Sequence, residues 1–228
     1  MNAGKRIVEL LNLTAQPVAV KFQDTPPLGT PHIDHVASAG CTYWKFAAAG
    51  RTFYTDAADH FGCPIGAHTH GIDLPDEQAK HLQGLVETMV QLQYIDMAEV
   101  PNIPRRTDPF HFAVYAPLAE ATFDPDVVLI SGTAKQMMIL AEAVHATGIA
   151  SDSSLVGRPT CAAIPAVMKS GRTATNLGCI GNRVYTGLPD DQLYFVIAGP
   201  QLAAVVDKLA IIVHANRELE KFHRARVA

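Results

Sequence analysis

The feature that most constrains the fold of this chain is a cysteine-bearing pattern that occurs twice. The first copy reads, in order, Cys41, Gly50-Arg51-Thr52, Gly62-Cys63-Pro64-Ile65-Gly66 and Leu74-Pro75-Asp76-Glu77-Gln78. The second copy reads Cys161, Gly171-Arg172-Thr173, Gly178-Cys179-Ile180-Gly181 and Leu188-Pro189-Asp190-Asp191-Gln192. Internal repeats indicate repeated structural units. We therefore predict two pseudo-symmetric halves that arose by an internal duplication and that bring matching elements to one centre.

Length and composition place both halves in one domain. The chain has 228 residues, of which 48% are hydrophobic and 18% are charged, as is typical of a globular protein with a sizeable core. We predict a single domain over residues 1–228, with the repeat units at approximately 35–95 and 155–228. Three prolines and two arginines in the segment 100–111 predict a linker between the halves.

Hydrophobic periodicity predicts both strands and helices. The predicted strands are 17–22, 51–55, 112–116, 127–131 and 193–198. The predicted helices are 1–13, 41–49, 76–92, 133–146, a short one between Pro159 and Gly171, and a long one from Pro200 onward. The segment 57–74 is predicted as a turn-rich connection. This order indicates an α/β or α+β fold with a mixed sheet flanked by helices.

The four cysteines of the chain all belong to the repeated pattern. Cys41 and Cys161 stand near predicted helix starts, where free N–H groups stabilise a thiolate. Cys63 and Cys179 stand between glycines that let the backbone approach a ligand closely. These settings suit an iron–sulfur cluster or a single iron or zinc ion held by all four thiolates. The spacings match no short ferredoxin or zinc-ribbon motif, so the four-thiolate site depends on the repeat.

Histidines distinguish the first copy from the second. His60, His68 and His70 surround Cys63, whereas no histidine stands near Cys179. One thiolate and three imidazoles could hold iron, zinc or copper, and an imidazole could act as a general acid or base near neutral pH. We therefore predict Cys63, His68 and His70 as catalytic and the three histidines as further metal ligands. In an extended segment His68 and His70 would point to one face. The alternative is that they are ordinary loop histidines.

Three arginines near the repeated motifs are candidates for binding an anionic ligand. Arg51 and Arg172 occupy equivalent positions in the two copies, and Arg183 follows the second Gly-Cys motif. Guanidinium groups recognise carboxylates and phosphates. The alternative is that these arginines cap carbonyl groups or pair with acids such as Asp56 and Asp191.

Three classes of function remain open on these residues. The leading hypothesis is a cysteine-ligated cofactor-binding protein with a role in redox chemistry or in activating a small ligand. The second is a small-anion binding or sensing protein whose cysteines are structural, because free cysteine often behaves as a small buried hydrophobe. The third is a thiol-based enzyme without a metal. The sequence lacks the glycine-rich dinucleotide and phosphate loops, the serine-hydrolase elbow and the zinc-protease motif.

Charge and hydropathy indicate which partners and which cellular location to expect. The net charge is −4 and the basic residues form no long run, which argues against nucleic acid as a partner. No apolar stretch approaches the about 20 residues that span a bilayer, and the N-terminal segment lacks the apolar stretch of a signal peptide. We expect a cytoplasmic protein without membrane attachment, whose redox partner or small-molecule ligand is unknown. A homo-oligomer remains open.

Several of these segments together resemble a known family. They are Cys41-Thr42-Tyr43-Trp44, Phe53-Tyr54, the run from Gly62 to His70, Val114-Tyr115-Ala116-Pro117-Leu118 and Gly178-Cys179-Ile180-Gly181-Asn182-Arg183. Over nearly its whole length the chain resembles the domain of unknown function 169. The resemblance implies a cytoplasmic prokaryotic protein, often from anaerobic bacteria or archaea. It implies no reaction and no catalytic residues.

Overall fold

Seven strands form a single mixed sheet in this structure, a computed structural model that describes residues 2–152 and 158–227. The strands are β1 Val18–Gln23, β2 Phe53–Asp56, β3 Phe112–Pro117, β4 Val127–Thr133, β5 Ser151–Asp152, β6 Thr173–Asn176 and β7 Gln192–Ala198. Their order is β2-β3-β1-β4-β7-β6-β5. All neighbours are antiparallel except β5 and β6, which are parallel. The predicted fold class, a mixed sheet flanked by helices, is confirmed.

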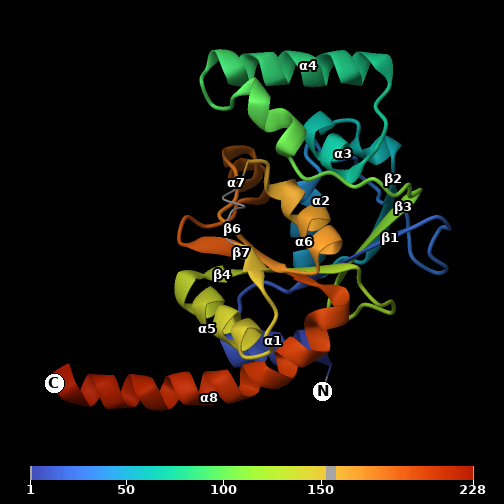
Figure 1. Cartoon of the computed structure of the whole chain (residues 1–228). Helices are drawn as coiled ribbons and strands as arrows, with labels where there is room; N and C mark the ends of the chain where they lie inside the picture. The colour runs from blue at the N-terminus through green and yellow to red at the C-terminus, as the bar shows by residue number, and fades with distance from the viewer. Residues whose placement is uncertain (1, 153–157, 228) are drawn as a thin grey trace.

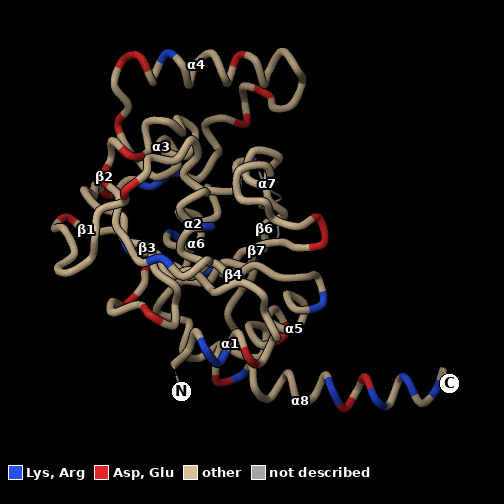
Figure 2. Tube along the Cα trace, turned by 180° about the vertical axis from the view of Figure 1, so that it is seen from behind, with Lys and Arg blue, Asp and Glu red and all other residues tan. Residues whose placement is uncertain are grey.

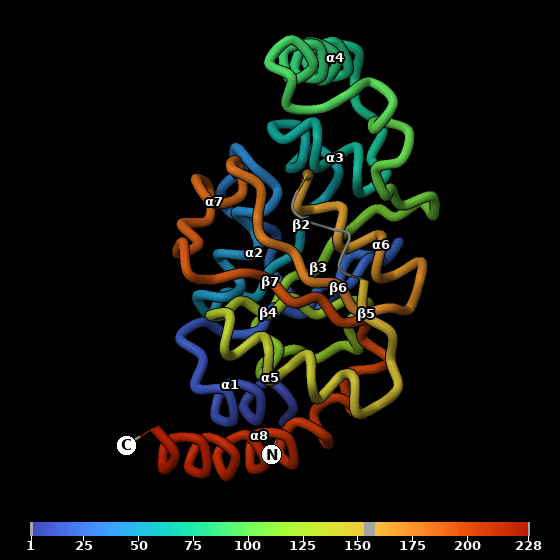
Figure 3. Tube along the Cα trace, turned by 60° about the vertical axis from the view of Figure 1, so that its left-hand side comes forward, coloured from blue at the N-terminus to red at the C-terminus, as the bar shows by residue number. Residues whose placement is uncertain are grey.

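Helices cover both faces of the sheet. They are α1 Ala3–Leu11, α2 Cys41–Ala48, α3 Pro64–His70, α4 Asp76–Gln91, α5 Ala134–His145, α6 Ala163–Ser170, α7 Ile180–Thr186 and α8 Leu202–Val227. Short 3-10 helices are η1 Ala58–His60, η2 Met97–Asn102, η3 Thr160–Ala162 and η4 Gly199–Gln201. Helices α2, α3, α6 and α7 lie on one side of the sheet, and α1, α5 and α8 lie on the other (Figure 1). Helix α4 lies outside α3, at the opposite end of the molecule from α8 (Figure 3).

The sheet separates two hydrophobic cores because successive side chains of a strand point to opposite faces. In β7, Tyr194 and Val196 belong to the core under α2 and α6, whereas Phe195 and Ile197 belong to the core under α5 and α8. The central strand β4 is buried on both faces, as its dense apolar sequence predicts. The first core contains the largest buried side chains, among them Trp44. It is also the core beneath the cysteines.

Most predicted elements are present, but α3, α7, β5 and β6 are missing from the prediction. Helix α5 begins where predicted, with Thr133 and Gln136 forming a capping box. The segment 57–74, predicted as a turn-rich connection, instead contains η1 and α3. Pro64 occupies the first turn of α3, where its missing N–H leaves no bond unmade, and Gly71 ends the helix in the left-handed region. The helix was missed because its seven residues include no repeat of apolar side chains.

The strand order reads the same outward from the central β1–β4 pair. On one side β1 is followed by β3 and β2, and on the other β4 is followed by β7 and β6. A duplication would produce this arrangement, although the duplication itself stays a prediction. The predicted linker at 100–111 leads into β3, which pairs with β1 and β2. If the duplication holds, the change of halves falls between β3 and β4, at residues 118–126.

Candidate functional site

Each of the four cysteines lies at the start of a helical element on the same side of the sheet. Cys41 is the first residue of α2, and Cys161 lies in η3, directly before α6. Cys63 and Cys179 are the N-cap residues of α3 and α7. All four are free thiols of intermediate exposure. Unpaired N–H groups at helix starts favour a thiolate or another anion there.

Packing between these elements brings the cysteine-bearing ends into neighbouring positions. Helix α2 contacts α7, and α3 contacts η3. The backbone N–H of Cys179 donates a hydrogen bond of 2.5 Å to Thr160 Oγ1, which joins the start of α7 to η3. The helices α2, α3, α6 and α7 can be followed on one side of the sheet in Figure 1. The sequence did not indicate which helix contacts which, because these contacts join distant parts of the chain.

Burial and mutual charge raise the pKa of two of these thiols. Burial and, after it, the charges of Cys63 and Cys179 raise the pKa of Cys41 to about 12, while the side chain of Asn182 acts in the opposite direction. The pKa of Cys161 is raised by burial and by the charges of the other three cysteines, while the side chain of Thr69 acts in the opposite direction. Each thiol therefore lies within electrostatic reach of others, and a bound cation would relieve the cost of ionising them.

No three of the four thiols form a compact group of potential ligands in this structure. In the part of the chain that the structure describes, only His32, Asp56 and Asp59 form a group of three potential ligands whose atoms all lie within 4.8 Å of one another. Four thiolates on one tetrahedral ion lie about 3.8 Å apart, given metal–sulfur bonds of about 2.3 Å. No three of the four cysteine sulfurs all lie within 4.8 Å of one another.

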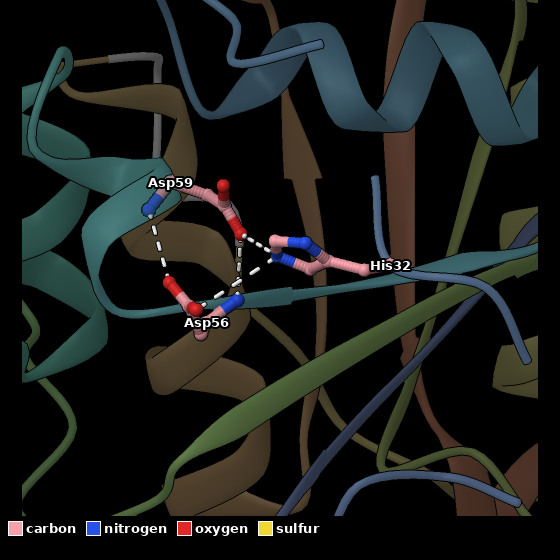
Figure 4. Close-up of side chains that lie close together, drawn as sticks. All are labelled: His32, Asp56 and Asp59. Atoms are coloured by element: carbon pink, nitrogen blue, oxygen red, sulfur yellow. Dashed lines mark hydrogen bonds and ion pairs between the residues drawn. The ribbon is translucent and has the colours of Figure 1, made fainter. Parts of the chain in front are cut away.

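The His32 group is held together by its own hydrogen bonds (Figure 4). His32 Nε2 lies 2.7 Å from Asp59 Oδ2 and 3.8 Å from Asp56 Oδ2. Asp59 Oδ2 also accepts the backbone N–H of Asp56, and Asp56 Oδ1 accepts the N–H of Ala58 at the start of η1. These bonds stabilise the turn after β2. They account for the two carboxylates without a metal.

The three histidines around Cys63 point in different directions. His60 and His70 are fully buried, and their rings meet edge to face with centroids 5.7 Å apart. His68 is half-buried and lines a pocket with Cys179. His68 and His70 would share a face only in an extended segment, whereas residues 64–70 form helix α3. In helix α3, residues two apart lie on nearly opposite sides.

The three candidate arginines bind groups of the protein itself. Arg51 forms an ion pair of 2.6 Å with Asp34. Arg172 donates to the carbonyl of Ser151, and Arg183 donates to the carbonyls of Leu177, Pro189 and Gln192. These contacts correspond to the alternative considered for them, in which arginines cap carbonyls or pair with acids. They are not gathered around one anion site.

Asn182 and Thr69 complete the surroundings of the cysteines and were not predicted from the sequence. Asn182 is buried in α7, its backbone N–H donates to Cys179 Sγ over an N···S distance of 3.4 Å, and its side chain lowers the pKa of Cys41. Thr69 is buried in α3, its hydroxyl donates to the carbonyl of Gly66, and its side chain lowers the pKa of Cys161. The only signal for Asn182 was its position three residues after Cys179, the usual distance from an N-cap to the N–H it accepts.

Comparison with known proteins identifies relatives without assigning a reaction. The model of a family described as "DUF169: Uncharacterised ArCR" matches residues 6–208. An uncharacterised protein of Methanocaldococcus jannaschii is 24% identical over 214 residues, which cover 90% of this chain and 91% of that protein. No solved structure matches. Within residues 2–152 and 158–227, none of the helices has the length and hydropathy needed to cross a membrane.

Proposed function

The chain belongs to the DUF169 family, and within it we propose that this protein holds an iron–sulfur cluster of the cubane type through Cys41, Cys63, Cys161 and Cys179. The cluster would take up and release one electron, or activate a small ligand beside it. The observation that carries the proposal is the position of all four cysteines at helix starts on one side of the sheet, within electrostatic reach of one another.

A cubane cluster does not require its thiolates to lie as close together as the ligands of a single ion. In a cubane cluster each thiolate binds a different iron, so the sulfurs lie further apart than the ligands of one ion. No group of three thiols within the described residues meets the 4.8 Å limit that a compact ion site would satisfy. Four mutually repelling thiolates would be stabilised by the positive charge of the iron atoms and by the helix starts.

Several buried polar atoms without a hydrogen-bond partner belong to residues close to the cysteines in the sequence. In the described part of the chain, Trp44 Nε1, His60 Nδ1 and Asn176 Nδ2 are buried without a hydrogen-bond partner. Each of these residues stands three positions from one of the cysteines in the sequence. Buried polar atoms of this kind usually bind an ion, a ligand or water. Hydrogen bonds to the sulfurs of a cluster would satisfy such donors and adjust its reduction potential.

Two alternative functions have less support. A thiol-based enzyme needs a thiolate nucleophile, whereas burial raises the pKa of Cys41 and Cys161 and keeps both protonated at neutral pH in the absence of a metal. A small-anion binding protein would need free cations around one site. Arg51 and Arg183, two of the three candidates, are engaged by Asp34 and by backbone carbonyls.

The first prediction is that protein purified without oxygen contains about four irons and four acid-labile sulfides per chain. Replacing any one of Cys41, Cys63, Cys161 or Cys179 by alanine should lower both contents at least severalfold, because each thiolate binds its own iron. Metal analysis and the visible spectrum measure this. His32→Ala is the matched control and should keep the wild-type contents. Stoichiometric zinc without sulfide, or cysteine variants with unchanged iron, would contradict the proposal.

A further inference from the structure

We propose that the pocket between α4 and the start of α7 binds a small, mainly apolar molecule with a carboxylate or carbonyl oxygen at one end. This space, here called the α4 pocket, has a volume of about 220 Å³ and includes Cys179 and His68 in its wall. Only one part of this inference rests on the proposed function, namely that an iron–sulfur cluster lies beside the bound ligand. Binding of the ligand itself depends on the walls of the pocket.

The walls of the α4 pocket favour an apolar occupant. Leu82, Val86 and Met89 face it from α4, a helix in which no residue is buried. Ile65 and Ile180 line it from α3 and α7, and Ile180 is 69% exposed. The hydrophobic stripe of α4 thus faces a pocket rather than a packed core. An apolar ligand would remove these side chains from water, which is the main source of binding free energy for such a site.

The polar groups of the α4 pocket favour an oxygen acceptor at one end of the ligand. His68 and Arg158 belong to the lining, and no aspartate or glutamate is among the described residues that line it. Arg158 is held in the wall by a hydrogen bond to the carbonyl of Tyr94 and by stacking on its ring, 5.4 Å from the centroid. Glu99, 3.5 Å from Arg158, lies outside the lining. A carboxylate or carbonyl would accept hydrogen bonds here, whereas an amine would find no acidic partner among the described residues of the lining.

The volume limits the size of the ligand. Drug-sized ligands occupy about 300–1,000 Å³, so the α4 pocket admits only a smaller molecule. Its volume equals that of roughly seven water molecules at about 30 Å³ each. A short straight-chain or single-ring carboxylate fits this limit. The end of that molecule beside Cys179 would lie next to the proposed cluster.

The test uses anaerobically purified full-length protein and isothermal titration calorimetry with butanoate, hexanoate, octanoate and decanoate. We expect affinity to rise about fourfold per added methylene until the chain fills the α4 pocket, and then to stop rising. Hexylamine should bind at least tenfold more weakly than hexanoate. Absence of binding by all four carboxylates, or equal affinity for hexylamine, would overturn the inference.

Iron and sulfide are measured in the same sample, so the two proposals can fail separately. Protein that binds hexanoate but never contains iron and sulfide overturns the proposed function and supports the pocket. Protein that contains the cluster but binds no carboxylate overturns the pocket alone. Both measurements, ligand binding and iron and sulfide content, use wild-type protein, so neither depends on whether a variant folds.

A pair of variants on one helix locates the binding. Val86→Phe places a larger side chain in the α4 pocket and should weaken hexanoate binding at least tenfold. Leu85→Phe is the matched control, since Leu85 is also half-buried on α4 but does not line the α4 pocket. Urea unfolding of both variants checks that they fold. Equal affinities in the two variants would place the ligand elsewhere and overturn the inference.

Discussion

His70 is a fully buried histidine with neither ring nitrogen bonded by any residue that the structure describes. Burial, and then the charges of His60 and Arg106, lower its pKa to about 3 from the usual 6.5. The folded protein therefore keeps His70 neutral at pH values where the unfolded chain takes up a proton. As pH falls below about 6.5, the proton stabilises the unfolded state, and this continues until the folded pKa is reached.

We predict that the free energy of unfolding of the metal-free protein falls between pH 6.5 and 4. His70→Phe should reduce this fall by about 1.4 kcal/mol per pH unit, since it removes one proton taken up on unfolding. Urea titrations at several pH values measure the slope. His223→Phe, at an exposed position of α8, is the matched control and should leave the slope unchanged. A wild-type slope in His70→Phe would show that His70 is protonated in the folded state.

At the residue scale, the sequence predicted where a residue lies in a helix better than it predicted the direction in which its side chain points. Cys41 and Cys161 were predicted near helix starts because Gly50 and Gly171 follow them at helical distance, and both lie there. The opposite directions of His68 and His70 were not predicted, because they depend on whether 64–70 is helical. The influence of the Asn182 side chain on the pKa of Cys41 joins residues 141 positions apart, and no local pattern indicates such a pair.

Helix α3 depends on the glycine that ends it. Gly71 has a φ of +79°, and a Cβ atom there would lie 2.6 Å from the carbonyl oxygen of Arg106. The same helix carries Cys63 at its other end. The backbone N–H of Arg106 bonds the carbonyl of Thr69, so the chain after η2 is fixed directly against the end of α3. A side chain at position 71 would force these two segments apart.

We predict that Gly71→Ala lowers the free energy of unfolding by more than about 1 kcal/mol, from the left-handed backbone and the close contact together. Gly84→Ala is the control within the neighbouring helix α4. A Cβ at position 84 meets no described atom within 4 Å, so this change should stabilise the protein by about 0.5–1 kcal/mol. Chemical denaturation measures both. Equal effects of the two substitutions would contradict the account of α3.

At the element scale, the predictable parts are those with a strong local signal. Helix α5 has a capping box and an apolar stripe, and β4 is a dense apolar run, so both were predicted. Helix α3 has neither signal, because its sequence combines proline, glycine and two histidines. Strand β6 is four residues long and was also missed. Its place is determined by pairing with β7, which the local sequence does not encode.

On the scale of the whole molecule, the sheet separates the cysteines from helix α8. The cysteines lie with α2, α3, α6 and α7, whereas α8 covers the other face with α1 and α5 (Figure 1). The repeated pattern predicted two similar halves around a shared centre, and the order of the strands is compatible with two such halves. The contact between α8 and α1 joins the two ends of the chain, and therefore could not be inferred from either segment alone.

Helix α8 extends beyond the body of the molecule, and its free end carries both acidic and basic residues (Figure 2). Its buried residues are Leu202, Val205, Val206, Leu209 and Val213. All of them precede Asn216, which bonds Glu142 of α5. The turns after Asn216 therefore contribute little to the core on that face of the sheet.

We predict that a chain ending at Asn216 keeps the wild-type iron and sulfide contents and loses less than about 2 kcal/mol of unfolding free energy, because the removed side chains are mostly exposed. Metal analysis and urea unfolding measure the two quantities. Leu209→Ala in the full chain is the contrasting variant: it removes a fully buried side chain and should cost about 2–5 kcal/mol. Loss of iron on truncation, with the fold retained, would mean that the end of α8 acts on the cysteine centre through the sheet. The separation of the two faces argued from the strand order would then be wrong.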